Sequence, residues 1–415
     1  MTFPDWQQLS PATAAREVHQ RVRERLSPAQ QRAVFAHLST ESELEHLFAA
    51  APRGQALSGV PYVLKDLFPV AGQSMLAGST FLPEVRPPAA RDAAIVEKLR
   101  AAGAVLVGRT HLTEFAYGIT GENPHYGDCE HPLFPGHVTG GSSSGSAAAV
   151  AAGIVPFAIG SDTGGSVRLP AAFCGLFGFR LTPQDPFIAD AFPLAPSYDT
   201  AGWFTSTAPD MATVIQSLGS LPTAPRAPRG CYVELPGLDA EVADTCAKAA
   251  ARIASRDKES RGAVLAALDQ SVNTYNTIVA DEAWAVHRDW SERFRNRYDP
   301  AIWERINRVH TVTEERRVAA RQRSAAIKRM WGEYFRSYDF LLLPASPFAA
   351  LTKSGCTPEN RLRILTLTAL ASIGGCPVLT LPVALPSGMT TGLQVVVPSA
   401  DSPAISWVLK KATAK

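Results

Sequence analysis

Two short loops rich in glycine and serine are the places where this chain is best equipped for chemistry. Their sequences are GGSSSGS at 140–146 and GSDTGGS at 160–166, and an alanine-rich run separates them. Glycine lets backbone approach a ligand closely, and successive N–H groups at such a turn can hold an anion. Serine hydroxyls in the same loops could attack an acyl group once a base removes their proton. The two loops therefore favour acyl transfer.

Two other interpretations of these loops stay open on the residues alone. A flexible linker would use the same residue types, although linkers do not usually sit between apolar strands and an alanine-rich helix. A phosphate site would also use them, but it would be expected to show GxxxxGKS/T or GxGxxG after a strand.

Lys65 is the candidate base, because it interrupts an apolar run from Val60 to Phe68. In water a lysine has a pKa near ~10.4 and is protonated at neutral pH, so it cannot accept a proton. Burial penalises the charged form and lowers that pKa. A surface ion pair is the usual role of a Lys-Asp pair such as Lys65-Asp66, but the apolar neighbours favour a buried, catalytic lysine.

The stretch from Thr139 to Thr182 closely resembles the signature of the amidase-signature family, through GGSSSGS and DTGGSVRLPA. GVPYVLKD at 59–66 is similar to the lysine strand of that family. Further similar segments lie at 106–118, 375–382 and 392–394. The resemblance covers most of residues 57–398, and it is loose in 1–50 and in 222–335.

The resemblance implies a serine hydrolase with a Ser-Ser-Lys triad. Ser166 matches the nucleophile that forms the acyl-enzyme, Ser142 matches a proton-passing serine on a cis peptide bond, and Lys65 matches the base. The oxyanion hole is matched by the amides of Thr163, Gly164, Gly165 and Ser166. No cofactor is implied. No metal is expected either, because the histidines lack H-x-x-x-H or HExxH spacing. Asp162 and Arg168 are expected to anchor their own loop.

GENPHYG at 121–127 and SYDTAGWF at 197–204 resemble short bacterial amidases of the indole-3-acetamide hydrolase type. This implies hydrolysis of a small primary amide with an apolar or aryl acyl group, such as indole-3-acetamide, to carboxylate and ammonia. No charged anchor for an acidic substrate is evident. The residues expected to bind substrate are Tyr117, Gly118, Phe173 and Trp203. Two alternatives are the catalytic subunit of a tRNA-dependent amidotransferase and a binding relative without activity.

Strands and helices must alternate around these loops in order to position them. Apolar runs such as 104–107, 340–343 and 378–385 predict strands, and 92–102 predicts an amphipathic helix. We expect an α/β fold: a single amidase-signature domain with a large mixed, mostly parallel sheet covered by helices on both faces. Residues 1–50 are expected to be an N-terminal helical extension, and 51–415 the catalytic domain. The charged segment 299–337 predicts two helices on the outside.

Composition limits the partners that the chain could have. Its 415 residues carry a formal net charge of +2 with no long basic tract, which argues against nucleic acid and anionic membranes as partners. No run approaches the ~20 apolar residues of a membrane helix, and the first ten residues lack the features of a signal peptide. We expect a cytoplasmic protein that acts on a small-molecule amide, with assembly as a homodimer left open.

Overall fold

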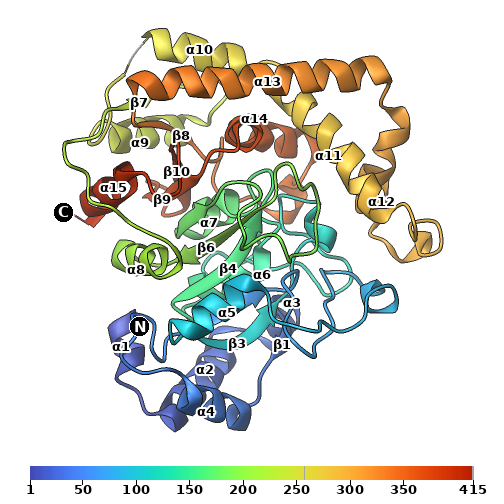
Figure 1. Cartoon of the computed structure of the whole chain (residues 1–415), viewed down its shortest axis with the longest axis vertical. Coiled ribbons are helices and arrows are strands. Elements are labelled where there is room, and N and C mark those ends of the chain that lie inside the picture. The colour runs from blue at the N-terminus through green and yellow to red at the C-terminus, as the bar shows by residue number, and fades with distance from the viewer. Residues whose placement is uncertain (257, 414–415) are drawn as a thin grey trace.

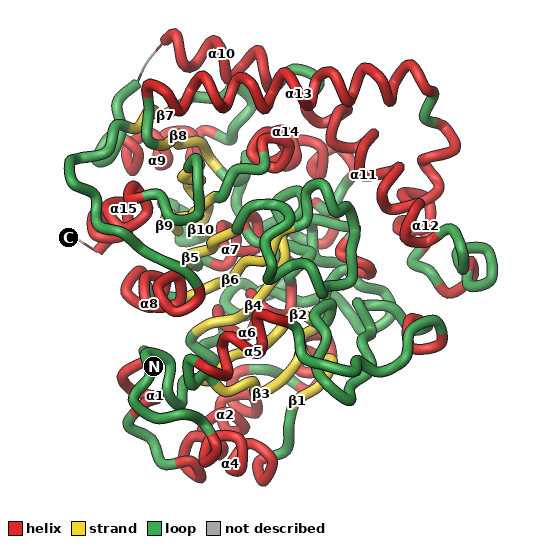
Figure 2. Tube along the Cα trace, viewed as in Figure 1, coloured by secondary structure: helices red, strands yellow, loops and turns green. Residues whose placement is uncertain are grey.

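The centre of the fold is a ten-stranded sheet. A computed structural model of the chain describes residues 1–256 and 258–413, and Figures 1 and 2 show their arrangement. The strands are β1 Phe35–Leu38, β2 Pro61–Lys65, β3 Val105–Thr110, β4 Phe157–Asp162, β5 Phe177–Arg180, β6 Thr200–Thr205, β7 Gly230–Tyr232, β8 Phe340–Pro344, β9 Val378–Ala384 and β10 Thr390–Val396. Their order across the sheet is β1-β3-β2-β4-β6-β5-β9-β10-β8-β7.

The sheet is mixed, as expected, and its parallel part is local. Strand β2 pairs in parallel with both β3 and β4, and β7 pairs in parallel with β8. All the other neighbouring pairs are antiparallel. The expectation of mostly parallel pairing therefore holds for the block β3-β2-β4, which carries Lys65, and not for the sheet as a whole. The reason is that β9 and β10 form a hairpin, and that β6 enters between β4 and β5.

Helices cover both faces of the sheet. Tyr62 and Leu64 pack in one hydrophobic core and Val63 packs in the other, because successive side chains of a strand point to opposite faces. The helices are α1 Phe3–Gln7, α2 Pro11–Arg25, α3 Pro28–Val34, α4 Glu41–Ala50, α5 Ala94–Ala101, α6 Ser144–Ala151, α7 Arg168–Cys174, α8 Ala208–Leu218, α9 Ala240–Ala250, α10 Lys258–Leu268, α11 Ser271–His287, α12 Pro300–Asn307, α13 Glu314–Ser337, α14 Pro358–Gly374 and α15 Pro403–Thr413. In the part of the chain that the structure describes, no helix is long and apolar enough to cross a membrane.

The N-terminal region is mainly helical and contains one strand. Ser10, Ser27 and Thr40 cap α2, α3 and α4, each accepting a hydrogen bond from a backbone N–H of the first turn. The prediction of a purely helical extension is wrong at Phe35–Leu38, which forms β1 and pairs with β3 at the edge of the sheet. Residues 1–50 are therefore built into the sheet as well as packed beside it (Figure 1).

Candidate active site

Lys65 lies at the centre of a buried cluster of hydroxyl groups. Its Nζ donates hydrogen bonds of 2.8 Å to Ser142 Oγ and of 2.8 Å to Ser161 Oγ. Lys65 and Ser142 are fully buried, and the peptide bond between Gly141 and Ser142 is cis, as the resemblance implies. The structure thus brings the expected base and the expected proton-passing serine into direct contact, and it adds Ser161.

The parallel pairing of β2 with β4 brings these groups together. Leu64 lies opposite Ile159, so Lys65 and Ser161 follow at the same edge of the sheet. Ser142 reaches this edge from the turn that precedes α6. Parallel strands collect functional groups at their carboxyl ends in this way. Ser161 could have been suspected from the sequence, because it stands inside the GSDTGGS loop.

Burial changes the acid–base behaviour of Lys65. The loss of water around the ammonium lowers the pKa of Lys65 to about 7, although the negative charges of Asp162 and Asp199 oppose that shift. A lysine with this pKa is partly neutral at neutral pH and has a lone pair that can accept a proton. Ser161 can hold one remaining N–H of that amine while the lone pair serves Ser142.

Ser166 stands at the end of the loop that follows β4, where the chain meets a cavity. Its residue is 5% exposed, which leaves it accessible only from that cavity, and it lines the wall with Thr163 and Gly164. The amide of Gly165 is not free for an oxyanion, because it donates to Asp162 Oδ1 at 2.8 Å. Of the four expected donors, the amides of Thr163, Gly164 and Ser166 make no hydrogen bond to any residue that the structure describes.

Asp162 holds the loop in place through a second buried cluster. Besides the Gly165 amide, its carboxylate accepts from the amides of Val167 and Arg168 and from the side chains of Arg168 and Arg180. All three charged side chains are fully buried. Burial alone would raise the pKa of Asp162, but the two guanidinium groups and the hydrogen bonds outweigh it and hold that pKa well below its usual range. The expectation that Asp162 and Arg168 anchor this loop is confirmed.

The cavity beside Ser166 has a volume of about 380 Å³. Its walls come from the loop after β3, the Ser166 loop and the helices α11, α12 and α14. We call it the Ser166 cavity; its lining residues are Ala116, Tyr117, Gly118, Ile119, Thr163, Gly164, Ser166, Leu194, Tyr275, Asn276, Ala301, Glu304, Arg305, Arg308, Pro358, Arg361, Leu362 and Leu365. A space of this size suits a small organic molecule.

The four residues expected to bind substrate divide into two pairs. Tyr117 and Gly118 line the Ser166 cavity. Phe173 and Trp203 do not: both are almost completely buried, Phe173 in a core cluster with Leu169 and Trp203 in the main core against Phe179. Their aromatic rings serve packing, and the expectation that these two form the pocket wall is corrected accordingly.

Three arginines also line the cavity, and sequence reasoning missed all of them. Arg305 donates to the carbonyl oxygen of Tyr117 at 2.5 Å, and Arg361 pairs with Glu122 at 2.6 Å. Arg308 is the third. Arg305 and Arg308 lie in 222–335, where the resemblance is loose, and Arg361 lies outside the quoted motifs, so no sequence signal tied the three to Ser166.

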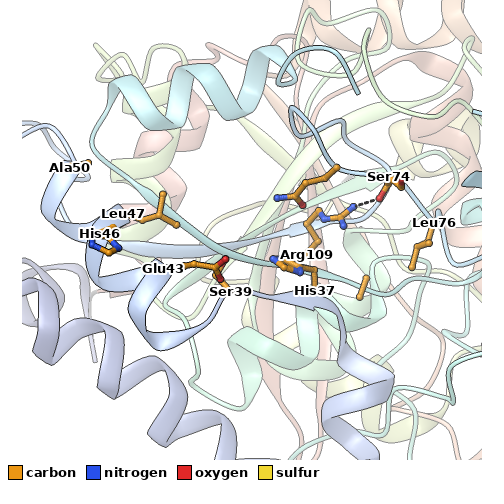
Figure 3. Close-up of a pocket in the computed structure, with 11 residues that line it drawn as sticks. His37, Ser39, Glu43, His46, Leu47, Ala50, Ser74, Leu76 and Arg109 are labelled. Atoms are coloured by element: carbon orange, nitrogen blue, oxygen red, sulfur yellow. Dashed lines mark hydrogen bonds between the residues drawn. The ribbon is translucent and has the colours of Figure 1, made fainter. Parts of the chain in front are cut away.

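A second, larger cavity of about 870 Å³ lies away from the catalytic serines, between α4, β1 and the loop after β2 (Figure 3). His46 and Leu47 of α4 line it on one side, and His37 of β1 lies beside Arg109 of β3. On the other side Arg109 donates to the carbonyl oxygen of Ser74, as the dashed line in Figure 3 marks. None of the expected catalytic residues lines it. Size alone does not decide the site, and the smaller cavity is the one that the predicted nucleophile Ser166 lines.

Comparison with known proteins matches this geometry to one family. Residues 17–404 match the Amidase protein family. The chain belongs to the Amidase family. It is 31% identical over 395 residues to 1-carboxybiuret hydrolase subunit AtzE of Pseudomonas sp. (strain ADP), covering 86% of this chain and 84% of that protein. It is 42% identical to an indoleacetamide hydrolase of Pseudomonas savastanoi, but over only 48% of this chain and 45% of that one.

The fold of this amidase agrees with solved structures along its whole length. A crystal structure of an amidase superimposes with a TM-score of 0.85 at 30% identity, covering 99% of both chains. The chain is thus an amidase-family hydrolase with the α/β fold of that family. Its relatives act on different amides, so the substrate has to be argued from the cavity of this chain.

Proposed function

We propose that this chain hydrolyses the C–N bond of a small carboxamide through an acyl-enzyme on Ser166. The observation that carries the proposal is the pair of 2.8 Å hydrogen bonds of Lys65, one of them to Ser142, in a cluster that burial keeps free of water. A serine held by a base in this way can take the proton from a nucleophilic hydroxyl, which is the part that we assign to Ser142 for Ser166.

In the proposed reaction, Ser166 Oγ attacks the carbonyl carbon as its proton passes to Ser142. Ser142 gives its own proton to neutral Lys65, since one hydroxyl can donate and accept at once. The amides of Thr163, Gly164 and Ser166 stabilise the negative charge on the carbonyl oxygen. The relay then runs backwards to protonate the leaving nitrogen, the amine departs, and water hydrolyses the ester in the same way.

The substrate that we propose is a primary amide whose acyl group has an apolar or aryl body, as in indole-3-acetamide. The walls nearest the Ser166 loop support this, because Ile119, Leu194 and Leu365 present apolar surface and Tyr275 presents an aromatic ring. Burying apolar area there favours binding by about 25 cal/mol per Å². A cytoplasmic location and a homodimer stay predictions.

A fluorophosphonate probe tests the proposal on the purified chain, without any partner protein. We expect mass spectrometry to find the adduct on Ser166, and we expect Ser166→Ala to lose both the adduct and amide hydrolysis. Ser354→Ala, which alters an exposed hydroxyl, is the matched control and should keep both. An adduct on Ser142 would show that the two serines have the opposite roles, and hydrolysis that persists in Ser166→Ala would reject the acyl-enzyme.

A further inference from the structure

Arg308 differs from the other two arginines of the Ser166 cavity in having no partner. Arg305 is held by the Tyr117 carbonyl and Arg361 by Glu122 and Thr120. Among the residues that the structure describes, no carboxylate lies within 4.0 Å of the Arg308 guanidinium, and no acceptor takes a hydrogen bond from it. A guanidinium has five N–H donors, and those that are buried normally bond to the protein or to ordered water, so Arg308 is free to bond to water or to a ligand in the cavity.

The position of Arg308 directs its charge into the cavity. It begins a 3₁₀ turn, Arg308–Thr311, directly after α12, and it is half-buried on the cavity wall. Its charge acts on Tyr117, which lines the same cavity: burial raises the pKa of Tyr117 to about 12, and the charge of Arg308 is the strongest one opposing that rise. Arg308 and Tyr117 therefore lie near each other on the cavity wall.

No acidic group in the described part of the chain pairs with Arg308 at this end of the cavity. Glu304 is the one carboxylate among the described lining residues, and it is exposed, one helical turn before Arg308 and beyond ion-pair distance. Glu122 is already paired with Arg361. The cavity thus has an oxyanion loop at one end and, in its wall, an unpaired cation.

We infer that the substrate is an amide whose acyl group ends in a carboxylate, and that Arg308 binds this carboxylate. The inference rests on the proposed function and changes its substrate: an apolar body contacts the leucines of the cavity wall, and an anionic end, which indole-3-acetamide lacks, meets the guanidinium. Arginine matches a carboxylate with two parallel N–H···O bonds, which fixes orientation as well as adding affinity. Arg308 is accordingly a specificity-determining residue that orients the scissile amide toward Ser166.

Glutaramate and pentanamide give a matched test, since they differ only by a carboxylate in place of a terminal methyl group. We expect kcat/KM of the native enzyme to be at least about tenfold higher for glutaramate. Arg308→Gln should lower kcat/KM for glutaramate about ten- to a hundredfold, mainly through KM, and should leave pentanamide within about twofold. For Arg308→Lys, kcat/KM for glutaramate should lie between the values of the native enzyme and of Arg308→Gln. Arg316→Gln, at an exposed position of α13, is the control and should change neither substrate.

Two results would overturn the inference: equal rates for both amides in the native enzyme, or an equal loss for both in Arg308→Gln, which would make Arg308 a structural residue. Calorimetry with the Ser166→Ala protein separates this failure from failure of the proposed function. Glutaramate should still bind there, and the added Arg308→Gln change should weaken it. If glutaramate binds in this Arg308-dependent way but the native enzyme hydrolyses no amide, the proposed function alone is rejected. If the native enzyme hydrolyses amides without a preference for glutaramate, only the inference is rejected.

Discussion

Two buried polar clusters meet at strand β4, and they differ in whether the buried charge has a countercharge beside it. Ser161 belongs to the first, in which Lys65 bonds, within the described part of the chain, to two hydroxyl groups and to no carboxylate. Asp162, the next residue, belongs to the second, in which Arg168 and Arg180 surround a single carboxylate. All five side chains are at most 4% exposed. Burial lowers the pKa of Lys65, which has no carboxylate in hydrogen-bond contact, and so allows its proton to be transferred. At Asp162 the buried charges are paired, and the cluster holds the Ser166 loop in place.

The largest effect is expected from Lys65→Met, which removes the base. Because general-base catalysis contributes roughly 10²- to 10⁴-fold, we expect kcat/KM at pH 7 to fall by that factor. In the native enzyme kcat/KM should rise as the pH passes about 7, where Lys65 loses its proton, and should level off above. Steady-state rates between pH 5.5 and 9 check both expectations. A native rate that is flat over this range would contradict the assignment of the base.

The same substitution should not lower stability at pH 7. The pKa of Lys65 is lower in the folded chain than in the unfolded one, so the unfolded chain binds more protons between pH 7 and about 10.5. The contribution of Lys65 to stability is therefore unfavourable at pH 7 and improves as the pH rises through that window.

The next largest effect is expected from Asp162→Asn, and it should appear in stability as well as in rate. Without the carboxylate, Arg168 and Arg180 are left buried beside each other with no countercharge, which costs about 3–5 kcal/mol. The folded pKa of Asp162 is depressed, so its contribution is present above pH ~3.8 and is lost as the pH falls below that value. Urea unfolding at pH 7 measures the loss. Asp401→Asn, on the surface, should leave the unfolding midpoint unchanged, and equal midpoints for both variants would show that the charged cluster does not hold the loop.

The smallest effect is expected from Ser161→Ala, which takes one acceptor away from Lys65 and leaves the bond to Ser142. The loss of one hydrogen bond to the amine should cost about tenfold or less in kcat/KM. The hydroxyl accepts from the charged form, so its removal should also move the inflection of the pH–rate profile to lower pH. An unchanged inflection together with an unchanged rate would reduce Ser161 to a packing residue.

The sequence alone predicts the catalytic cluster better than the cavity around it. The glycine-serine loops and Lys65 lie in continuous motifs, and the apolar runs that become β2, β3, β8 and β9 are visible without a structure. Strand β6 is not, because TAGWFT mixes small, aromatic and polar residues, and only its place between β4 and β5 buries it on both faces. Because the sequence does not reveal β6, it also does not reveal that Trp203 is buried in the core.

The cavity wall is set by contacts between segments far apart in the chain. The sequence predicts two charged helices in 299–337, and the structure has α12 and α13 there. Charge alone indicates a solvated surface, however, and cannot show that Arg305 and Arg308 face Tyr117 almost 190 residues earlier. A substrate anchor of this kind becomes visible only when the packing of α12 is known.

Tyr275 of α11 occupies the space that a side chain at position 164 would need, since a Cβ added to Gly164 would lie 2.3 Å from Tyr275 Oη. A helix outside the glycine-serine motif therefore limits which residue can occupy position 164 inside it. In homologues the two positions should vary together, a larger residue in the loop requiring a smaller one on the helix. Redesign of the acyl specificity through α11 has the same constraint: every change at position 275 also changes the room left for the loop that holds the reacting carbonyl.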